Sequence, residues 1–129
     1  MVTALIGKDQ YKTELITSGH YLIADEPAEK KGTNLGPDPQ EFLLSALASC
    51  TAITLRMYAD RKQWPVDQIK VYVTVETMKE KSIFKCEISI EGTLDESQRD
   101  KMVQIAKSCP VHKILTNPIE VNTELLVAG

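Results

Sequence analysis

A single run of mostly apolar residues, from Phe42 to Ala59, limits most strongly what this chain can fold into. Thirteen of its 18 residues are apolar, and Arg56 is its only charged residue. The apolar positions do not keep to one face of a helix, so a helix formed here has to be covered on nearly all sides. The alternative is a membrane span, but serines, threonines and the arginine interrupt a run that is barely long enough to cross a bilayer. We therefore expect a core helix and no membrane partner.

The helix has a clear predicted start. Asp38 is suited to cap it, Pro39 to occupy its first position, and Glu41 lies three residues after the cap, as in a capping box. From residue 39 to 62 it would extend about 36 Å, which is long for a chain of 129 residues. One sheet cannot cover every face of such a helix. We therefore expect a second copy of the chain to cover the rest in a homodimer.

The segments on both sides of this helix predict an α+β fold. Alternating apolar and polar residues between turn signals indicate strands, and capping residues indicate helices. In order, the predicted elements are strands at 2–6, 11–17 and 20–24, the helix at 39–62, strands at 69–76 and 84–90, a helix capped by Asp95, a helical turn at 110–115 and a strand at 119–127. In the helix after Asp95, the residues expected to face inward are Met102, Val103, Ile105 and Ala106. We expect antiparallel sheet packed against helices, in a single domain over residues 1–129.

The charge and the cysteine content narrow the possible partners and the compartment. The net charge is −3 and the pI is about 5.4. The chain lacks the basic stripe that binds nucleic acids, so no nucleic-acid partner is expected. Three cysteines is an odd number, unusual for a secreted disulfide-bonded domain and ordinary in a reducing compartment. The first apolar run ends before Lys8 and Asp9, which makes it too short for the apolar core of a signal peptide. These features predict a cytoplasmic protein.

Each cysteine has a structural interpretation, and one also has a strong chemical interpretation. Cys86 lies on the same face of its predicted strand as the apolar residues, which favours a place in the core. Cys50 lies in the middle of the apolar helix, where core packing is also the simplest interpretation. Cys109 precedes Pro110, and proline favours the first position of a helix. The thiol of Cys109 is therefore expected at a helix N-terminus, where the partial positive charge lowers its pKa. His112 adds to this effect if protonated. The residues alone therefore nominate Cys109 as the more reactive thiol, with turn capping as the alternative.

Metal and cofactor sites are not indicated by the sequence. Cys109 and His112 could supply two metal ligands, with Cys50 and His20 as further candidates. Structural zinc sites usually show two close ligand pairs, and only one is present here. The chain also has no glycine-rich phosphate loop, nucleophile elbow or metalloprotease motif. We therefore expect no metal and no cofactor.

Four segments of the chain resemble the OsmC-like family, which comprises osmotically inducible protein C and the organic hydroperoxide resistance proteins. They are residues 19–27, 36–51, 54–65 and 108–115, and they include both Cys50 and Cys109. The resemblance covers nearly the whole chain, its motifs follow in the family's order, and the two cysteine motifs together are specific. The resemblance therefore carries expectations for fold, activity and site residues.

The resemblance implies an OsmC-like fold, in which antiparallel sheets wrap around long central helices in an intertwined homodimer. It also implies a cofactor-free, thiol-dependent peroxidase that reduces organic hydroperoxides and acts as an antioxidant under oxidative stress. Cys50 would attack the peroxide and become a sulfenic acid, and Cys109 would resolve it to a disulfide. A small dithiol or another cellular thiol would then reduce the pair. The family gives the first attack to Cys50, whereas the helix-terminus argument favours Cys109; we follow the family.

Two positions depart from the hydroperoxide-reducing members that the chain resembles. Those members place a glutamate ten residues before the reactive cysteine and pair it with an arginine from the N-terminal part. Here that position holds Gln40, and the first arginine of the chain is Arg56. The departure motivates a second hypothesis, a non-catalytic dimer of the same family that senses redox state or binds a small ligand.

Glu41, the acidic residue next to the replaced position, is the third candidate catalytic residue. It lies nine residues before Cys50, about 13 Å along a helix and on its opposite face. It therefore either meets the site of a partner chain or serves as the capping-box residue that its spacing indicates.

Overall fold

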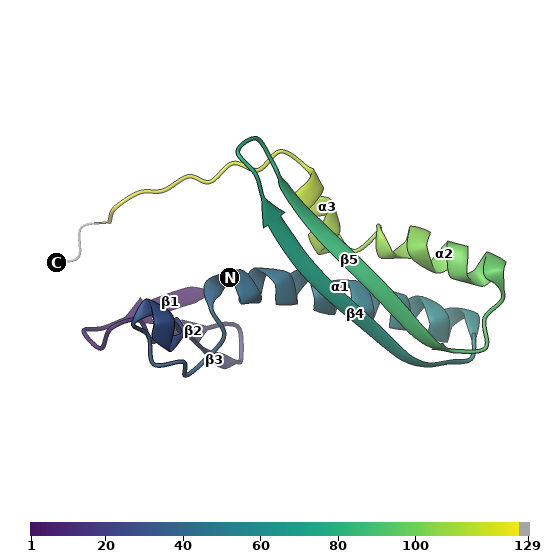
Figure 1. Ribbon diagram of the computed structural model, residues 1–129, viewed down its shortest axis with the longest axis horizontal. Coiled ribbons are helices and arrows are strands. Elements are labelled where there is room, and N and C mark those ends of the chain that lie inside the picture. The colour runs from purple at the N-terminus through teal and green to yellow at the C-terminus, as the bar shows by residue number, and fades with distance from the viewer. Residues whose placement is uncertain (127–129) are drawn as a thin grey trace. The chain divides into compact units, whose positions relative to one another are not determined.

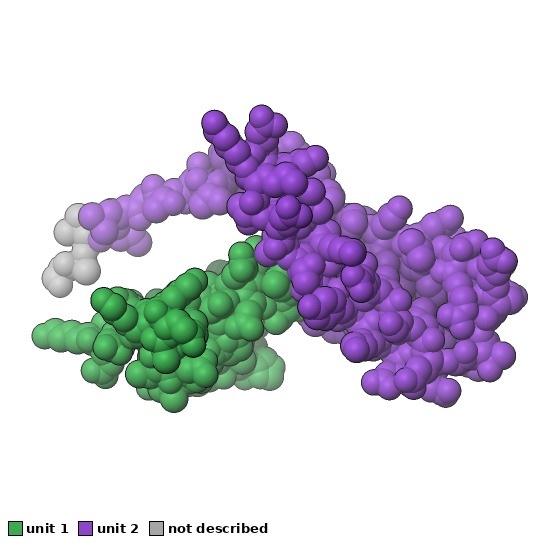
Figure 2. Space-filling view, viewed as in Figure 1, with its two compact units in different colours: residues 1–46 green, residues 47–129 purple. Residues whose placement is uncertain are grey.

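The computed structural model describes residues 1–126 and has an α+β architecture (Figure 1). Its elements, in chain order, are β1 (Thr3–Ile6), β2 (Thr13–Ile16), β3 (Tyr21–Ala24), the 3-10 helix η1 (Ala28–Lys30), α1 (Pro39–Lys62), β4 (Val66–Thr77), β5 (Ser82–Gly92), α2 (Glu96–Ala106) and α3 (Pro110–Thr116). The predicted fold class and the predicted bounds of the long helix are confirmed. The chain forms two compact units, residues 1–46 and the residues from 47 onward (Figure 2).

The first unit contains a three-stranded antiparallel sheet in the order β1–β2–β3. Thr3 pairs with Ile16 across the first hairpin, and Thr13 pairs with Ala24 across the second. Gly19, in the second turn, has a φ of 98°, a left-handed conformation that glycine adopts without steric cost. The three short strands predicted from the turn signals are therefore confirmed.

A buried aspartate organises the loop between β3 and α1. The Asp25 carboxylate accepts hydrogen bonds from the Thr33 hydroxyl at 2.7 Å and from the backbone N–H groups of Leu35 and Glu26 at 3.1 and 2.7 Å. The hydrogen bond from Thr33 is the main reason that the pKa of Asp25 is lowered. One carboxylate thus holds the loop on both sides of η1.

The start of α1 is fixed by the predicted capping box. The Glu41 backbone N–H donates to the Asp38 carboxylate at 2.8 Å, and the Asp38 backbone N–H donates to the Glu41 carboxylate at 3.1 Å. Two backbone donors that a helix start leaves free are therefore satisfied reciprocally. Of the two roles open to Glu41, the capping contact is confirmed.

The second unit is built on a long two-stranded antiparallel hairpin, β4 and β5, shown in teal and green in Figure 1. Ile69 pairs with Ile90 and Val73 with Cys86, so the alternating apolar residues of both strands share one face. The core of the unit joins residues of α1, the hairpin and α2. Its buried members are Leu55, Tyr58, Ala59, Val66, Leu94 and Met102.

Two short helices follow the hairpin, and each begins at the predicted cap. Asp95 and Gln98 form a complete capping box at the start of α2. Cys109 is the N-cap residue of α3, and Pro110 occupies the first turn, where a missing backbone N–H costs nothing. The chain therefore breaks between α2 and α3 at the position that places the Cys109 sulfur at the N-terminus of a helix.

The two faces of α1 in the second unit differ strongly in exposure. Leu47, Thr51 and Leu55 are buried within the chain, whereas Ile53 and Met57 are 54% and 67% exposed. By length and composition α1 could cross a membrane, with a mean hydropathy of 1.4. The core helix of a soluble protein meets the same criterion.

Three predictions about individual segments are wrong. Within the described residues, 119–126 form no strand, because they pair with no other strand; Val127, the predicted last residue, lies outside the described residues. Val103 is 54% exposed and does not face the core, unlike Met102. Cys86 is exposed and does not fill the core, because the face of β5 that carries it borders a cavity at this point.

Candidate functional site

Two elements of the second unit bring the thiols of Cys50 and Cys109 together. Cys50 lies near the middle of α1 and is half-buried, whereas Cys109, at the start of α3, is fully buried. The two thiols lie close enough that each shifts the pKa of the other. The two residues that the resemblance nominated therefore interact, although they lie far apart in the sequence.

The surroundings of Cys109 favour its thiolate form. Its sulfur accepts a hydrogen bond from the backbone N–H of His112 at 3.5 Å, and others from the Val111 backbone and the Thr51 hydroxyl. Burial acts to raise the pKa of this thiol. The hydrogen bond from Cys50 and the other three donors outweigh burial, so the pKa of Cys109 is lowered.

Cys50 experiences the opposite shift. Burial raises the pKa of its thiol, and the hydrogen bond and charge of Cys109 raise it further. Hydrogen bonds from the Val111 backbone and the Thr54 hydroxyl act in the other direction without reversing the shift. When the pair holds one proton, that proton therefore stays on Cys50 and the negative charge stays on Cys109.

The hydroxyls of Thr51 and Thr54 belong to the site, although the sequence motifs do not single them out. Thr51 is buried and its hydroxyl contacts the sulfur of Cys109, whereas the Thr54 hydroxyl contacts the sulfur of Cys50. Helical spacing could have indicated Thr54, because residues four apart on a helix are neighbours. Thr51 could be recognised only from the fold, because its partner comes from another element.

Arg56 does not contact the thiol pair. Its guanidinium donates to the Val66 carbonyl at 3.0 Å and lies 3.4 Å from the Asp60 carboxylate. It thus joins the end of α1 to the start of β4. Within residues 1–126, no group of three or more histidine, cysteine, aspartate and glutamate side chains is placed to hold a metal ion.

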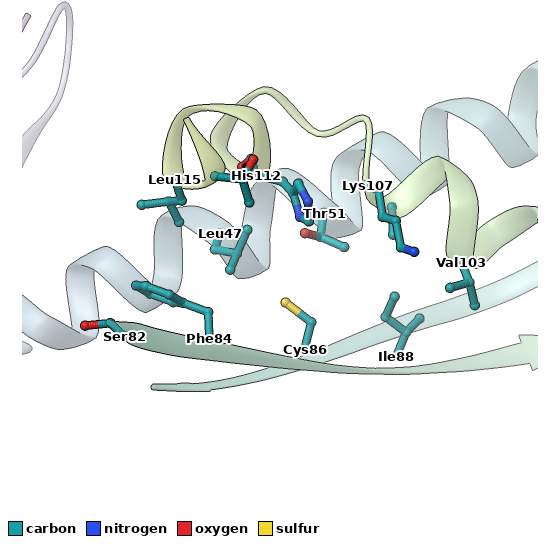
Figure 3. Close-up of a pocket in the computed structure, with 12 residues that line it drawn as sticks. Leu47, Thr51, Ser82, Phe84, Cys86, Ile88, Val103, Lys107, His112 and Leu115 are labelled. Atoms are coloured by element: carbon teal, nitrogen blue, oxygen red, sulfur yellow. Dashed lines mark hydrogen bonds between the residues drawn. The ribbon is translucent and has the colours of Figure 1, made fainter. Parts of the chain in front are cut away.

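A cavity of about 290 Å³ lies next to the thiol pair, within the second unit (Figure 3). Thr51 and His112, which both hydrogen-bond to Cys109, form part of its lining, and Figure 3 shows the thiol of Cys86 on the β5 side. Burial and the charge of Cys109 raise the pKa of Cys86. The third cysteine is therefore a protonated thiol on the wall of a cavity, separate from the hydrogen-bonded pair.

Known proteins with this fold share its arrangement at low sequence identity. A protein described as OsmC-like from Mycoplasma pneumoniae is 21% identical, with a TM-score of 0.75 over 88% of this chain and 84% of that chain. An organic hydroperoxide resistance protein OsmC from Legionella pneumophila is 20% identical, with a TM-score of 0.61 over 90% and 88%. An organic hydroperoxide resistance protein from Elizabethkingia anophelis is 13% identical, with a TM-score of 0.64 over 93% and 91%.

The match at the level of sequence families covers most of the chain. No curated protein sequence matches it closely. The family model described as OsmC-like protein matches residues 32–124, which include α1, the hairpin, α2 and α3 and therefore both cysteines of the pair. The family membership that the sequence motifs indicated is thus confirmed, and the chain belongs to the OsmC-like protein family.

Proposed function

We propose that this protein is a thiol-dependent peroxidase that reduces organic hydroperoxides through the Cys50 and Cys109 pair. The observation that carries the proposal is that α1 and α3 bring the two thiols together, so closely that each shifts the pKa of the other. A peroxidase of this kind needs one thiol that attacks and a second that condenses with the oxidised product. The names of the Legionella and Elizabethkingia neighbours support hydroperoxides as the substrate class.

In the first step, Cys109 acts as the base for Cys50. The Cys50 proton moves to the neighbouring Cys109 sulfur, and the Cys50 thiolate attacks the outer oxygen of the hydroperoxide. The O–O bond breaks, Cys50 becomes a sulfenic acid, and the alkoxide takes the proton from Cys109 and leaves as an alcohol. Cys109 is a thiolate again, so the same group serves as base and as acid.

In the second step, the Cys109 thiolate attacks the sulfur of the Cys50 sulfenic acid. A disulfide forms and hydroxide leaves, taking a proton from solvent. An external thiol or dithiol then reduces the disulfide, and the low pKa of Cys109 makes it the better leaving group in that exchange.

The active form that we propose is a homodimer. Ile53 and Met57 leave an apolar face of α1 uncovered beside Cys50, at helical spacings of three and seven residues. A second copy that covers this face would also enclose the half-buried Cys50 in apolar surroundings. Such surroundings favour an organic hydroperoxide over hydrogen peroxide.

Intact-protein mass spectrometry under non-reducing conditions tests the proposal. After one equivalent of cumene hydroperoxide, we expect the reduced protein to lose two hydrogens, with the bond mapping to Cys50 and Cys109. In a Cys109→Ser variant we expect an added oxygen on Cys50 in place of the disulfide. Unchanged thiols in the wild-type protein after this treatment contradict the proposal.

A redox sensor is the second candidate, and the position of Arg56 favours it. The arginine is bound to the Asp60 carboxylate and the Val66 carbonyl, so it is not free to orient a peroxide at the thiol pair. A sensor would form the disulfide once and turn over slowly. Sustained consumption of cumene hydroperoxide with dithiothreitol, well above the rate of dithiothreitol alone, distinguishes the peroxidase from the sensor.

A further inference from the structure

The cavity beside the thiol pair has the chemistry of a small-molecule site that the peroxidase cycle does not use. Four elements of the second unit, α1, β5, α2 and α3, contribute to its wall. Neither Cys50 nor Cys109 is among its twelve lining residues, so the reacting sulfurs lie outside it. Its volume of about 290 Å³ lies near the lower limit of ligand sites, roughly 300 Å³. The occupant is therefore small.

The lining of the cavity is largely apolar. Its apolar members are Leu47, Phe84, Ile88, Val103, Ala106 and Leu115. Val103 is 54% exposed although its side chain is aliphatic. Filling the cavity with an apolar group would remove these side chains from water, which is favourable by about 25 cal/mol for each Å².

The basic lining residues lie on one side of the cavity. Figure 3 shows Lys107 and His112 on the helical side of the cavity, opposite the residues of β5. None of the twelve lining residues is acidic. In the part of the chain that the structure describes, Lys107 forms no ion pair, since the ion pairs found there are Arg56 with Asp60 and Lys85 with Glu87. An ammonium without a counterion at the edge of an apolar cavity favours an anion there.

We propose that this cavity binds a small apolar organic anion, with its carboxylate between Lys107 and His112 and its hydrocarbon part against Phe84, Ile88 and Leu115. The charge selects an anion over a neutral or cationic compound of the same shape, and the apolar wall selects a hydrocarbon chain over a hydrophilic anion. The site is independent of the peroxidase cycle, because it requires no oxidation of any thiol.

Cys86 makes the occupancy of the cavity measurable without any activity assay. Its thiol is exposed and lies on the cavity wall. An occupant therefore shields it from alkylation. The experiment treats the reduced full-length protein with N-ethylmaleimide, with and without sodium octanoate, and follows Cys86 by peptide mass spectrometry. The same series is repeated with octanol and octylamine, and octanoate binding is measured separately by isothermal titration calorimetry.

We expect octanoate to slow the alkylation of Cys86 and the other two compounds to have less effect at equal concentration. Lys107→Gln should weaken octanoate binding about fivefold, the loss expected for one partly exposed ion pair. Lys113→Gln, which removes a lysine of α3 that does not line the cavity, should bind like the wild type.

Three results would overturn the proposal. Equal protection by octanol and octanoate would mean that the cavity selects for apolar shape alone. Unchanged octanoate affinity in Lys107→Gln would mean that the charge of Lys107 does not contribute to binding. Failure of N-ethylmaleimide to reach Cys86 in the free protein would mean that another part of the protein, such as a second copy, covers the cavity in solution. None of these results depends on whether the protein reduces peroxides.

Discussion

Cys50 and Cys109 shift each other's pKa in opposite directions: beyond the effect of burial, their interaction raises the pKa of Cys50 and lowers the pKa of Cys109. The N–H groups of Val111 and His112 and the hydroxyl of Thr51 all act on Cys109 in this direction. On this view the pair obtains from a helix terminus the anion stabilisation that an arginine would provide elsewhere.

Replacing Cys109 by serine should stop the cycle at the first oxidation product. Without the second thiol no disulfide can form, and without its thiolate Cys50 lacks a base. We expect turnover with cumene hydroperoxide and dithiothreitol to fall about 100-fold or more. Dimedone labelling of Cys50 after peroxide treatment should rise in this variant and remain low in the wild type. A Cys86→Ser variant serves as the control, and loss of its turnover would contradict the assignment of the pair.

Removing the Thr51 hydroxyl should raise the pKa of Cys109. Thr51→Val keeps the shape of the side chain and deletes a donor to the sulfur. We expect the titration of the thiolate, followed by its ultraviolet absorbance, to move to higher pH by about half a unit to one unit. Thr54→Val is the matched variant on Cys50 and should leave the Cys109 titration near its original position. An unchanged titration in Thr51→Val would argue against a contribution from this hydroxyl.

The thiol pair should make the stability of the fold depend on pH. Because the pKa of Cys109 is lower in the folded chain than in the unfolded chain, its thiolate stabilises the fold above the unfolded value, and this stability is lost as the pH falls through the lowered pKa. Cys50 has a raised pKa, so its contribution is full below the unfolded pKa and is lost as the pH rises through the folded value. The difference in Tm between wild type and Cys109→Ser should therefore grow as the pH rises from the lowered pKa of Cys109 toward its unfolded value of about 8.5. A difference that is constant over this range would contradict the shift.

Asp25 should be important for stability. Asp25→Ala leaves the Thr33 hydroxyl and the N–H groups of Glu26 and Leu35 without their buried acceptor. We expect the free energy of unfolding in urea to fall by about 2–3 kcal/mol. Asp100→Ala, on the exposed face of α2, is the control and should change it by less than about 0.5 kcal/mol. Equal effects of the two variants would mean that the loop is held by other contacts.

Glu41→Gln separates the capping role of this residue from a catalytic role. Glutamine also completes a capping box, so stability should stay within about 0.5 kcal/mol of the wild type. Because the Glu41 carboxylate is already engaged by the Asp38 backbone, we expect peroxide turnover to be unchanged as well. A large loss of turnover at unchanged stability would instead assign a catalytic role to the carboxylate.

Much of the fold follows from local signals in the sequence. The bounds of α1 and the starts of α2 and α3 are given by caps and prolines, because these residues satisfy or remove specific backbone donors. The pKa of Cys109 is lowered as predicted, and the backbone groups of His112 and Val111 at the helix start contribute to this, after the larger effect of Cys50. These features depend on residues within a few positions of one another.

The remaining features depend on contacts between distant segments. The alternation of residues along β5 placed Cys86 on its apolar face. Alternation does not show whether that face packs against a core or borders a cavity. The alternation at 119–126 is typical of a strand, yet a strand also needs a partner edge. The contact of Thr51 with Cys109 joins two elements, so no local pattern could indicate it.

The sulfur of Cys109 is also the cap of a helix. In the reduced protein it satisfies the His112 N–H in the first turn of α3. Once a second sulfur is bonded to it, the same atom is neutral and a far weaker acceptor. In the proposed cycle the first turn of α3 would then lose its anionic cap, so oxidation would loosen this helix end and reduction would tighten it. The oxidation state of two sulfur atoms would thereby be converted into a change of backbone order.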